Sequence, residues 1–227
     1  MSEVATRPPD DRFAAALRGF GPAGILAFLA IVAGNLIVPP LSAILVLLWA
    51  WRSRTPWREI GYARPRSWIR TLALGTLFGA AFKLAMKALV MPLLGADPVN
   101  HAYHDLAGNT AALPGALYLV IVGAGFGEET VFRGYFFERL GKLFGSGAVA
   151  KTAIVLFTSA VFALAHVHDQ GLAGAEQAAF TGLVFGTIFA RTGNIWLPMV
   201  AHAAFDVTAV AIIYRDAESA IAHLLFR

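Results

Sequence analysis

The chain has 227 residues, of which 58% are hydrophobic and only 14% are charged. A soluble domain of this length would carry nearly twice that charged fraction, and the apolar residues come in blocks long enough to cross a bilayer as helices. The absence of cysteine excludes disulfides, thiolate catalysis and cysteine metal sites. The formal charge of +4 is spread over the ends of the apolar blocks and forms no nucleic-acid patch. We therefore predict an all-α, polytopic membrane helix bundle.

The N-terminal part of the chain divides into a polar leader, residues 1–19, and the start of a single membrane-embedded domain, residues 20–227. The leader lacks the short apolar core and cleavage site of a signal peptide. Gly21 to Trp51 is apolar but too long for one comfortable span, and Pro39-Pro40 interrupts it. We expect two short helices forming a hairpin, with the break near Asn35 to Pro40; one long kinked helix is the alternative.

After a loop with six arginines and one glutamate, "RSRTPWREIGYARPRSWIR", further apolar segments follow. They predict spans at Trp68–Leu94, Leu113–Leu140, Thr152–His166, Leu172–Ala190 and Ile195–Tyr214. Together with the N-terminal hairpin these make about seven transmembrane helices. The tail from Arg215 to Arg227 is expected along the membrane surface.

The distribution of basic residues predicts the orientation. With an N-terminal hairpin, the leader, the six-arginine loop and the basic residues Arg139, Lys142, Lys151 and Arg191 fall on one side of the membrane. The loops at 95–112 and 167–171, which lack Lys and Arg, fall on the other. By the positive-inside rule the N-terminus is cytoplasmic. We predict an integral protein of the bacterial inner membrane.

Charged and titratable side chains within predicted spans mark a candidate site, because such groups are costly at bilayer depth and usually face the bundle interior. They are Glu128, Glu129, Arg133, His166, His202 and Asp206, with Lys83 and Lys87 on an earlier span. We predict that Glu128, His166 and His202 converge in one cavity in the cytoplasmic half to the middle of the membrane. For the lysines we expect snorkelling or pairing with a carboxylate.

Helical geometry places Glu128 and Glu129 on different faces of their helix. Glu129 and Arg133 are four residues apart, so they share a face and can form an ion pair. Glu128 is rotated by about 100° from Glu129 and is left to face a cavity. His202 and Asp206 are also four residues apart and lie on one face.

A carboxylate with two histidines, and no cysteine or serine nucleophile motif, points to water activation. Glutamate can act as a general base, and histidine can share the proton or stabilise an oxyanion. The same residue types can instead bind Zn²⁺. The zinc-protease pattern HExxH is absent.

Three short motifs resemble those of a known family. "EETVFR" at Glu128–Arg133 matches the EExxxR signature of the CPBP intramembrane proteases, which include the CAAX prenyl endopeptidases and the bacterial Abi proteins. "FALAH" ending at His166 resembles the family's FxxxH motif, and "HAAFD" from His202 to Asp206 resembles its third motif. "TPWREIGYARP" resembles a segment of bacterial members. The CPBP-like core covers about residues 113–214.

The resemblance implies a membrane endopeptidase that hydrolyses a peptide bond of a membrane-associated protein or peptide, prenylated or not. It implies that Glu128 and His166 activate water, that His202 and Asp206 stabilise the oxyanion, and that Glu129 and Arg133 support the site. Asp206 departs from the prenyl endopeptidases, which have Asn there, and an ionised Asp cannot donate to an oxyanion. The cofactor is either absent or Zn²⁺, the latter held by Glu128, His166, His202 and Asp206.

Two other function classes are compatible with the sequence. One is a non-catalytic immunity or scaffold protein of the Abi type, which would keep the fold without needing the complete set of motifs. The other is a proton-coupled transporter, in which Glu128 and the histidines relay protons. The intact motifs favour the protease, and the pseudo-repeated halves expected of a transporter are not evident in the sequence.

Overall fold

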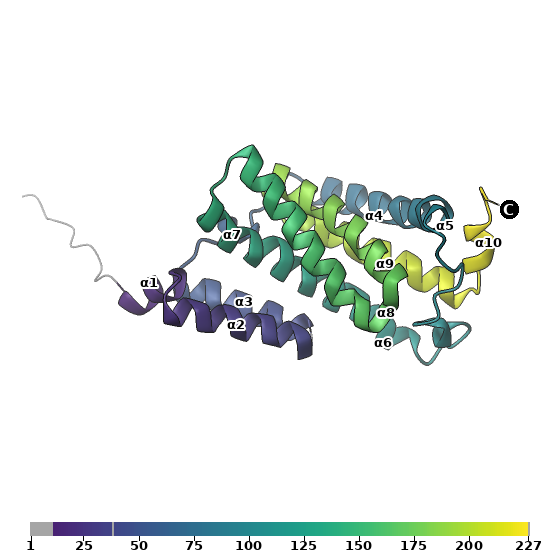
Figure 1. Cartoon of the computed structure of the whole chain (residues 1–227), viewed down its shortest axis with the longest axis horizontal. Coiled ribbons are helices and arrows are strands. Elements are labelled where there is room, and N and C mark those ends of the chain that lie inside the picture. The colour runs from purple at the N-terminus through teal and green to yellow at the C-terminus, as the bar shows by residue number, and fades with distance from the viewer. Residues whose placement is uncertain (1–10, 38, 227) are drawn as a thin grey trace, which may run out of the picture.

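The computed structural model describes residues 11–37 and 39–226. Within these ranges the chain is helical, with no strand, so the predicted all-α fold is confirmed (Figure 1). In chain order the elements are α1 (Arg12–Arg18), α2 (Pro22–Ile37), α3 (Pro39–Ser53), η1 (Trp57–Ile60), α4 (Trp68–Ala85), η2 (Met86–Val90), α5 (Met91–Leu93), η3 (His104–Leu106), α6 (Leu113–Tyr118), η4 (Leu119–Glu128), η5 (Thr130–Tyr135), α7 (Phe136–Phe144), α8 (Ala148–Thr192), α9 (Trp196–Tyr214) and α10 (Glu218–Ala222).

Helices α2 and α3 form the predicted N-terminal hairpin. The hydroxyl of Ser42 on α3 donates to the carbonyl of Ile31 on α2 over 2.6 Å. A Cβ at Gly34 would lie 3.1 Å from Leu45, so the two helices approach closely there. The break falls between Ile37 and Pro39, and Val38 itself lies outside the described residues, as do residues 1–10 of the predicted leader.

Elements α6, η4, η5 and α7 follow one another without interruption and form one long helical segment, Leu113–Phe144. Its middle is unusual, because η4 and η5 are π-helices of 10 and 6 residues. π-Helical turns are rare and occur frequently at functional sites. The carboxylates Glu128 and Glu129 lie where η4 meets η5.

Helix α8 is a hairpin of two helical arms. Gly171, at φ 65° and ψ −163°, has a conformation that no helix contains and that favours glycine. The arms then pack against each other, since a Cβ at Gly182 would lie 2.9 Å from Ser159 and one at Gly186 would lie 3.4 Å from Val155. The predicted spans 152–166 and 172–190 are therefore the two arms of α8.

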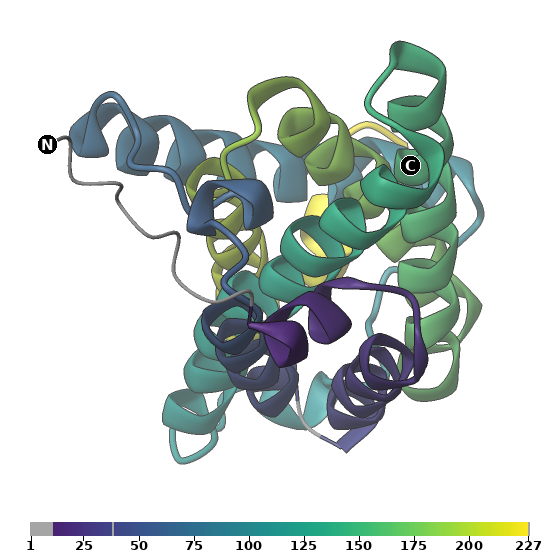
Figure 2. The same cartoon turned by 90° about the vertical axis from the view of Figure 1, so that its left-hand side faces the viewer.

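Helix α9 lies at the centre of the bundle, between α4 and η4. Glycines permit the close approach on both sides, because a Cβ at Gly79 would lie 2.1 Å from the carbonyl oxygen of Ala201 and one at Gly125 would lie 2.8 Å from Ala203. Figure 2 views the bundle from its α1 end, with the N-terminal hairpin on the side of the Leu113–Phe144 segment away from α4. The tight packing of α9 brings its side chains within reach of Glu128 and Glu129.

The exterior of the bundle is apolar while charged groups lie inside. Side chains such as Ile69, Leu77 and Leu164 are at least 69% exposed, whereas Glu129 and Arg133 are 0% and 2% exposed. This is the reverse of a soluble protein, in which ionised groups are rarely buried and large apolar surfaces are covered. The protein is an integral membrane protein.

The predicted number of about seven spans is not confirmed. Among the described residues four helical segments are long and apolar enough to cross a membrane, or five if the pair α1 and α2, bent by 57°, forms one span. This number takes the whole of α8 as one segment, although Gly171 divides it into two arms, and it leaves out α3, which has 15 residues.

The basic segments of the chain meet at one end of the bundle. Arg18 Nη1 donates to the carbonyl of Ser53 over 2.6 Å, and Arg139 Nη1 donates to the carbonyl of Arg18 over 2.8 Å. Lys142 lies 3.6 Å from Glu59 of the arginine-rich loop. The loop at 95–112 and α10 lie at the opposite end (Figure 1). The turn at Gly171 lies beside that loop, since Gln170 Nε2 donates to the hydroxyl of Tyr103 over 3.1 Å.

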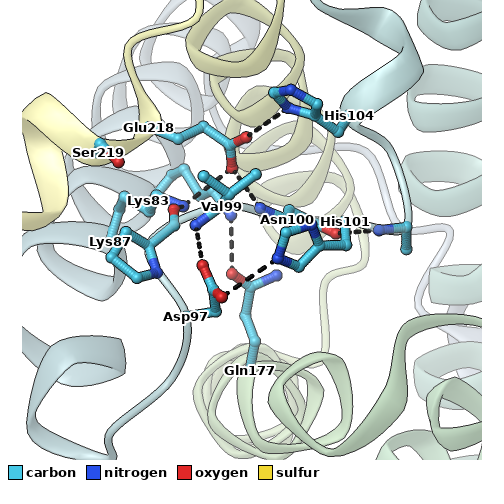
Figure 3. Close-up of polar contacts among 12 residues, drawn as sticks. Lys83, Lys87, Asp97, Val99, Asn100, His101, His104, Gln177, Glu218 and Ser219 are labelled. Atoms are coloured by element: carbon cyan, nitrogen blue, oxygen red, sulfur yellow. Dashed lines mark hydrogen bonds and ion pairs between the residues drawn. The ribbon is translucent and has the colours of Figure 1, made fainter.

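Part of the C-terminal tail packs against the bundle, and its expected place along the membrane surface stays a prediction. Glu218 and Ala222 of α10 are only 3% and 4% exposed. Glu218 forms an ion pair of 2.9 Å with Lys87 of η2, so this part of the tail folds onto the bundle (Figure 3). The pair also confirms the expected carboxylate partner for Lys87.

Replacing Gly79 with alanine tests the packing of α4 on α9. The added Cβ would overlap the backbone of Ala201, and we expect the free energy of unfolding to fall by about 1–3 kcal/mol. Denaturant unfolding in detergent micelles measures this change. Gly115→Ala is the matched control, since nothing lies within 4 Å of a Cβ there; equal stability of the two variants would contradict the close contact.

Candidate active site

Glu129 and Arg133 form the predicted ion pair. Arg133 Nη1 lies 2.9 Å from Glu129 Oε1, and both side chains are buried. The guanidinium also faces two aromatic rings, with Cζ 5.0 Å from the centroid of Phe162 and 5.8 Å from that of Phe185. Cation–π attraction adds to the ion pair in a water-poor setting. Glu129 is therefore held in a fixed position.

The sequence did not reveal that Glu129 also binds His202. Nδ1 of His202 lies 2.7 Å from Glu129 Oε1. A carboxylate paired with arginine only accepts hydrogen bonds, so Nδ1 is the donor. This contact crosses from one helix to another, and no spacing in a single sequence signals it. Glu129 is thus a positioning residue that fixes the orientation of the His202 ring.

The other nitrogen of His202 faces the two remaining carboxylates. Nε2 lies 3.8 Å from Glu128 Oε2 and 3.4 Å from Asp206 Oδ2. The His202–Asp206 proximity follows from their spacing on α9, as predicted. Glu128 Oε2 is buried and has no hydrogen-bond partner among the described residues. A buried acceptor without a partner is costly, so the oxygen is available for an incoming group.

His166 reaches the same space from the first arm of α8. Its Nδ1 lies 2.7 Å from the carbonyl oxygen of Phe162, and its ring lies 4.5 Å from the Phe162 ring, centroid to centroid. A carbonyl only accepts, so Nδ1 carries a hydrogen and donates it. When the ring is neutral, Nε2 is then left with a free lone pair. Phe162 and His166, the two ends of the predicted FxxxH motif, are therefore in direct contact, and Phe162 orients the ring of His166.

A cavity of about 390 Å³ joins these groups. Glu128, His166, His202 and Asp206 all line it, so the predicted convergence of the site residues agrees with the geometry. Glu129 and Arg133 are absent from the lining and lie behind it. Further polar side chains of the lining, which the sequence analysis did not assign to the site, are Lys83, Asn100, Tyr103, Asp169, Gln170, Gln177 and Thr181.

The cavity extends to the end of the bundle opposite the basic segments. Asn100 and Tyr103 of the loop at 95–112, and Asp169 and Gln170 beside the Gly171 turn, line its outer part. The hydroxyl of Tyr103 accepts from Gln170 Nε2 over 3.1 Å. Burial raises the pKa of Tyr103, and nearby carboxylates add to this effect, so its hydroxyl stays protonated.

The segment "TPWREIGYARP" supports the site from the basic end. The hydroxyl of Tyr62 lies 2.7 Å from Thr130 Oγ1, next to Glu129 in the chain. Its ring packs edge-on against Trp196 at the start of α9, with centroids 5.3 Å apart. Burial raises the pKa of Tyr62 to about 12. One residue thus links the helices that carry Glu129 and His202.

Three other histidines, at positions 101, 104 and 168, lie outside this set. The ring of His168 is 96% exposed and pairs with Asp169 over 2.6 Å. His101 pairs with Asp97 over 3.2 Å in the exposed loop, and His104 lies 3.8 Å from Glu218. None of the three lines the 390 Å³ cavity.

The predicted zinc ligands do not form a metal-binding group as arranged. Among residues 11–37 and 39–226 no group of three or more His, Asp or Glu side chains is placed to hold a metal ion. Nδ1 of His202 donates to Glu129 and Nδ1 of His166 donates to Phe162, which leaves the Nε2 atom of each ring free, as in histidines that bind a metal. The side chains as placed form no group of three ligands among the described residues, and we derive no step through a metal.

The fold and the site define a class: a helical membrane protein with carboxylates and histidines around an internal cavity. Residues 110–208 match the family described as "Rce1-like: Type II CAAX prenyl endopeptidase Rce1-like". This segment is an Rce1-like domain, consistent with the CPBP family, and the predicted resemblance is confirmed. No match is found among curated proteins or among solved structures. The family supports an intramembrane endopeptidase in general terms.

Replacing Arg133 with methionine tests whether the ion pair stabilises the fold. The change leaves Glu129 buried without its guanidinium partner, so the free energy of unfolding should fall by about 3–5 kcal/mol. Adding Glu129→Gln removes the uncompensated charge and should restore part of the loss. Denaturant unfolding of the single and double variants measures the coupling. Losses that simply add would show that the two residues act independently.

Proposed function

We propose that this protein hydrolyses a peptide bond of a membrane-associated protein or peptide, with water activated by Glu128 and His166. The observation that carries the proposal is the buried Glu128 Oε2, without a hydrogen-bond partner among the described residues, in a cavity that His166 and His202 also line. A carboxylate held in this way can take a proton from water. The Rce1-like match supports the same reaction class.

In the proposed reaction Glu128 is the general base. Water lies between Glu128 and His166 and attacks the carbonyl carbon of the scissile bond, while its proton passes to Glu128. Nε2 of His166 accepts the second hydrogen bond of the water, because its Nδ1 already donates to Phe162. The proton on Glu128 then passes to the leaving amide nitrogen as the C–N bond breaks.

His202 is the proposed hydrogen-bond donor that stabilises the oxyanion. Glu129 fixes its ring through Nδ1 and thereby directs Nε2 toward the cavity. With both ring nitrogens protonated, Nε2–H donates to the oxyanion of the tetrahedral intermediate. Asp206 Oδ2, 3.4 Å from Nε2, favours this charged form of the ring by its negative charge. Asp206 therefore acts through His202 and does not itself donate to the oxyanion.

The substrate reaches this site from the end of the bundle that bears the loop at 95–112. The outer lining of the cavity comes from that loop and from the Gly171 turn. The basic segments gather at the opposite end, which the positive-inside rule places in the cytoplasm. The proposed site therefore opens toward the non-cytoplasmic side, and its substrates present their cleavage sites there.

Glu128→Gln and His166→Ala test the chemistry. Each should lower kcat for cleavage of a membrane-anchored peptide by at least about 100-fold, since a positioned base or proton acceptor is lost. Purified protein in nanodiscs, assayed with a prenylated and a non-prenylated fluorogenic peptide, provides the measurement and separates the two substrate classes.

Two matched variants serve as controls for that assay. Glu176→Gln makes the same change on a carboxylate that does not line the cavity, and His168→Ala removes an exposed histidine two residues from His166. Both should cleave at near the unmodified rate. Substantial cleavage by Glu128→Gln and His166→Ala would rule out the assignment.

The orientation is testable because the chain has no cysteine. Ala111→Cys and Ser146→Cys place single thiols at exposed positions at opposite ends of the bundle. In intact bacteria a membrane-impermeant maleimide should label the thiol at 111 and reach the thiol at 146 only after permeabilisation. The reverse pattern would place the mouth of the cavity in the cytoplasm.

A further inference from the structure

A row of aromatic rings lies at the basic end of the bundle. Trp57 of η1 packs edge-on against Tyr62, with ring centroids 6.2 Å apart. Tyr62 packs in turn against Trp196 of α9 over 5.3 Å, and Trp196 packs against Trp68 of α4 over 5.1 Å. The outer members of the row, Trp57 and Trp68, are 46% and 41% exposed. Because Trp and Tyr side chains gather at the level of the lipid headgroups in membrane proteins, the row marks that level at this end of the bundle.

Exposed arginines lie beside this row in the chain. The segment between residues 52 and 70 contains six arginines, of which two are paired. Arg52 lies 3.0 Å and Arg54 lies 3.3 Å from Oδ2 of Asp11. The other four are exposed and have no carboxylate oxygen of the described residues within 4 Å: Arg58, Arg64, Arg66 and Arg70. The described part of the chain thus leaves these four positive charges without a counter-charge.

The backbone between these arginines is fixed on the bundle. The N–H of Ile195 donates to the carbonyl of Gly61 over 3.0 Å, and Nδ2 of Asn194 donates to the carbonyl of Ala63 over 2.9 Å. Gly61 has a φ of 82°, and a Cβ there would lie 2.4 Å from the ring of Phe189, so the chain turns tightly against the second arm of α8. A surface that is held in place before it binds a ligand loses little conformational freedom on binding.

We propose that this end of the bundle binds the headgroups of anionic phospholipids in the adjoining leaflet. The binding surface, called the headgroup surface below, consists of the two outer tryptophans of the row and the four exposed arginines: Trp57, Trp68, Arg58, Arg64, Arg66 and Arg70. A phosphate group accepts two N–H hydrogen bonds from one guanidinium group, which makes arginine well suited to bind it. The exposed indole rings lie beside the arginines at the level of the headgroups. This inference does not rest on the proposed catalysis.

The neighbouring exterior of α4 favours a lipid over a soluble anion. Ile69 and Leu72, on either side of Arg70 in the chain, are 81% and 51% exposed. Apolar side chains next to arginines match a ligand that has both a charged headgroup and hydrocarbon chains. A soluble phosphate would meet the arginines alone, whereas a phospholipid meets both kinds of side chain.

The aromatic row also connects the headgroup surface to the candidate site. The hydroxyl of Tyr62 lies 2.7 Å from Thr130 Oγ1, next to Glu129 in the chain. Trp196 is the first residue of α9, which carries His202. A lipid on the headgroup surface therefore contacts the segment that links these two helices. Since it binds the folded protein, it should also stabilise it.

Arg64→Gln/Arg66→Gln tests the proposal. Both side chains are exposed, so the variant should fold as the unmodified protein does. The control, Arg12→Gln/Lys151→Gln, removes the same charge from exposed positions of α1 and α8.

Tryptophan fluorescence reports the binding, because brominated acyl chains quench nearby indole rings. The proteins are placed in nanodiscs of phosphatidylcholine to which brominated phosphatidylglycerol or brominated phosphatidylcholine is added in increasing fractions. Every protein carries Trp51→Phe, which removes an exposed indole outside the row. The remaining tryptophans are then the three of the row and the buried Trp49.

The unmodified arginines and the control variant should prefer phosphatidylglycerol to phosphatidylcholine by about tenfold or more, since each arginine near an anionic headgroup contributes roughly fivefold. Arg64→Gln/Arg66→Gln should lower this preference by about tenfold. Equal quenching by the two lipids with all arginines present would overturn the proposal. An equal loss of preference in the control variant would overturn it as well, because only the net charge of this end would then matter.

Thermal unfolding in detergent micelles distinguishes a lipid from a soluble anion. Added phosphatidylglycerol should raise the unfolding temperature of the unmodified protein, and Arg64→Gln/Arg66→Gln should lose this rise. Phosphatidylcholine and inorganic phosphate should leave the temperature unchanged. A rise with inorganic phosphate alone would assign the surface to a soluble anion, and an equal rise in both proteins with phosphatidylglycerol would place the lipid elsewhere; either result would overturn the proposal.

Discussion

The arrangement of the site depends on one buried electrostatic network, Arg133–Glu129–His202. In a medium of low dielectric an unpaired carboxylate or guanidinium is costly, so each member constrains the next. Glu129 is within 2.9 Å of both its partners and joins the Leu113–Phe144 segment to α9. The orientation of His202 is consequently set by groups that do not face the cavity. Glu128, without an ion pair this close, is left to meet an incoming group.

This network can form because the backbones approach closely. Gly125 lets η4 lie against α9, and Gly79 lets α4 lie against the opposite side of α9. A larger residue at either position would separate helices whose contacts hold the charges in place. On the lipid-facing surface one large apolar side chain can replace another without separating two helices. The positions that require a small residue are therefore concentrated around α9.

Much of the site was accessible from the sequence, since the charged residues of the spans are few and their spacing is helical. The Glu129–Arg133 pair and the shared face of His202 and Asp206 follow from a four-residue spacing alone. The Glu129–His202 bond and the place of Lys83 depend on how separate helices pack, which local spacing does not encode. The predicted count of about seven spans is not confirmed, since hydropathy marks apolar segments without showing how they are divided: α3 has only 15 residues, and the two arms of α8 are continuous across Gly171.

The π-helical turns give the site an unusual dependence on chain length. A π-helix is held by bonds between residues five apart, one more than in an α-helix. Removing a single residue from η4 would let one such turn relax to α-helical geometry, and the helix on either side would keep its place in the bundle. Only the residues of the relaxed turn would change the face that they present, and Glu128 is the last residue of η4. A one-residue deletion is thus a short route from a chain with this site to one that keeps the fold and loses the position of its cavity-facing carboxylate.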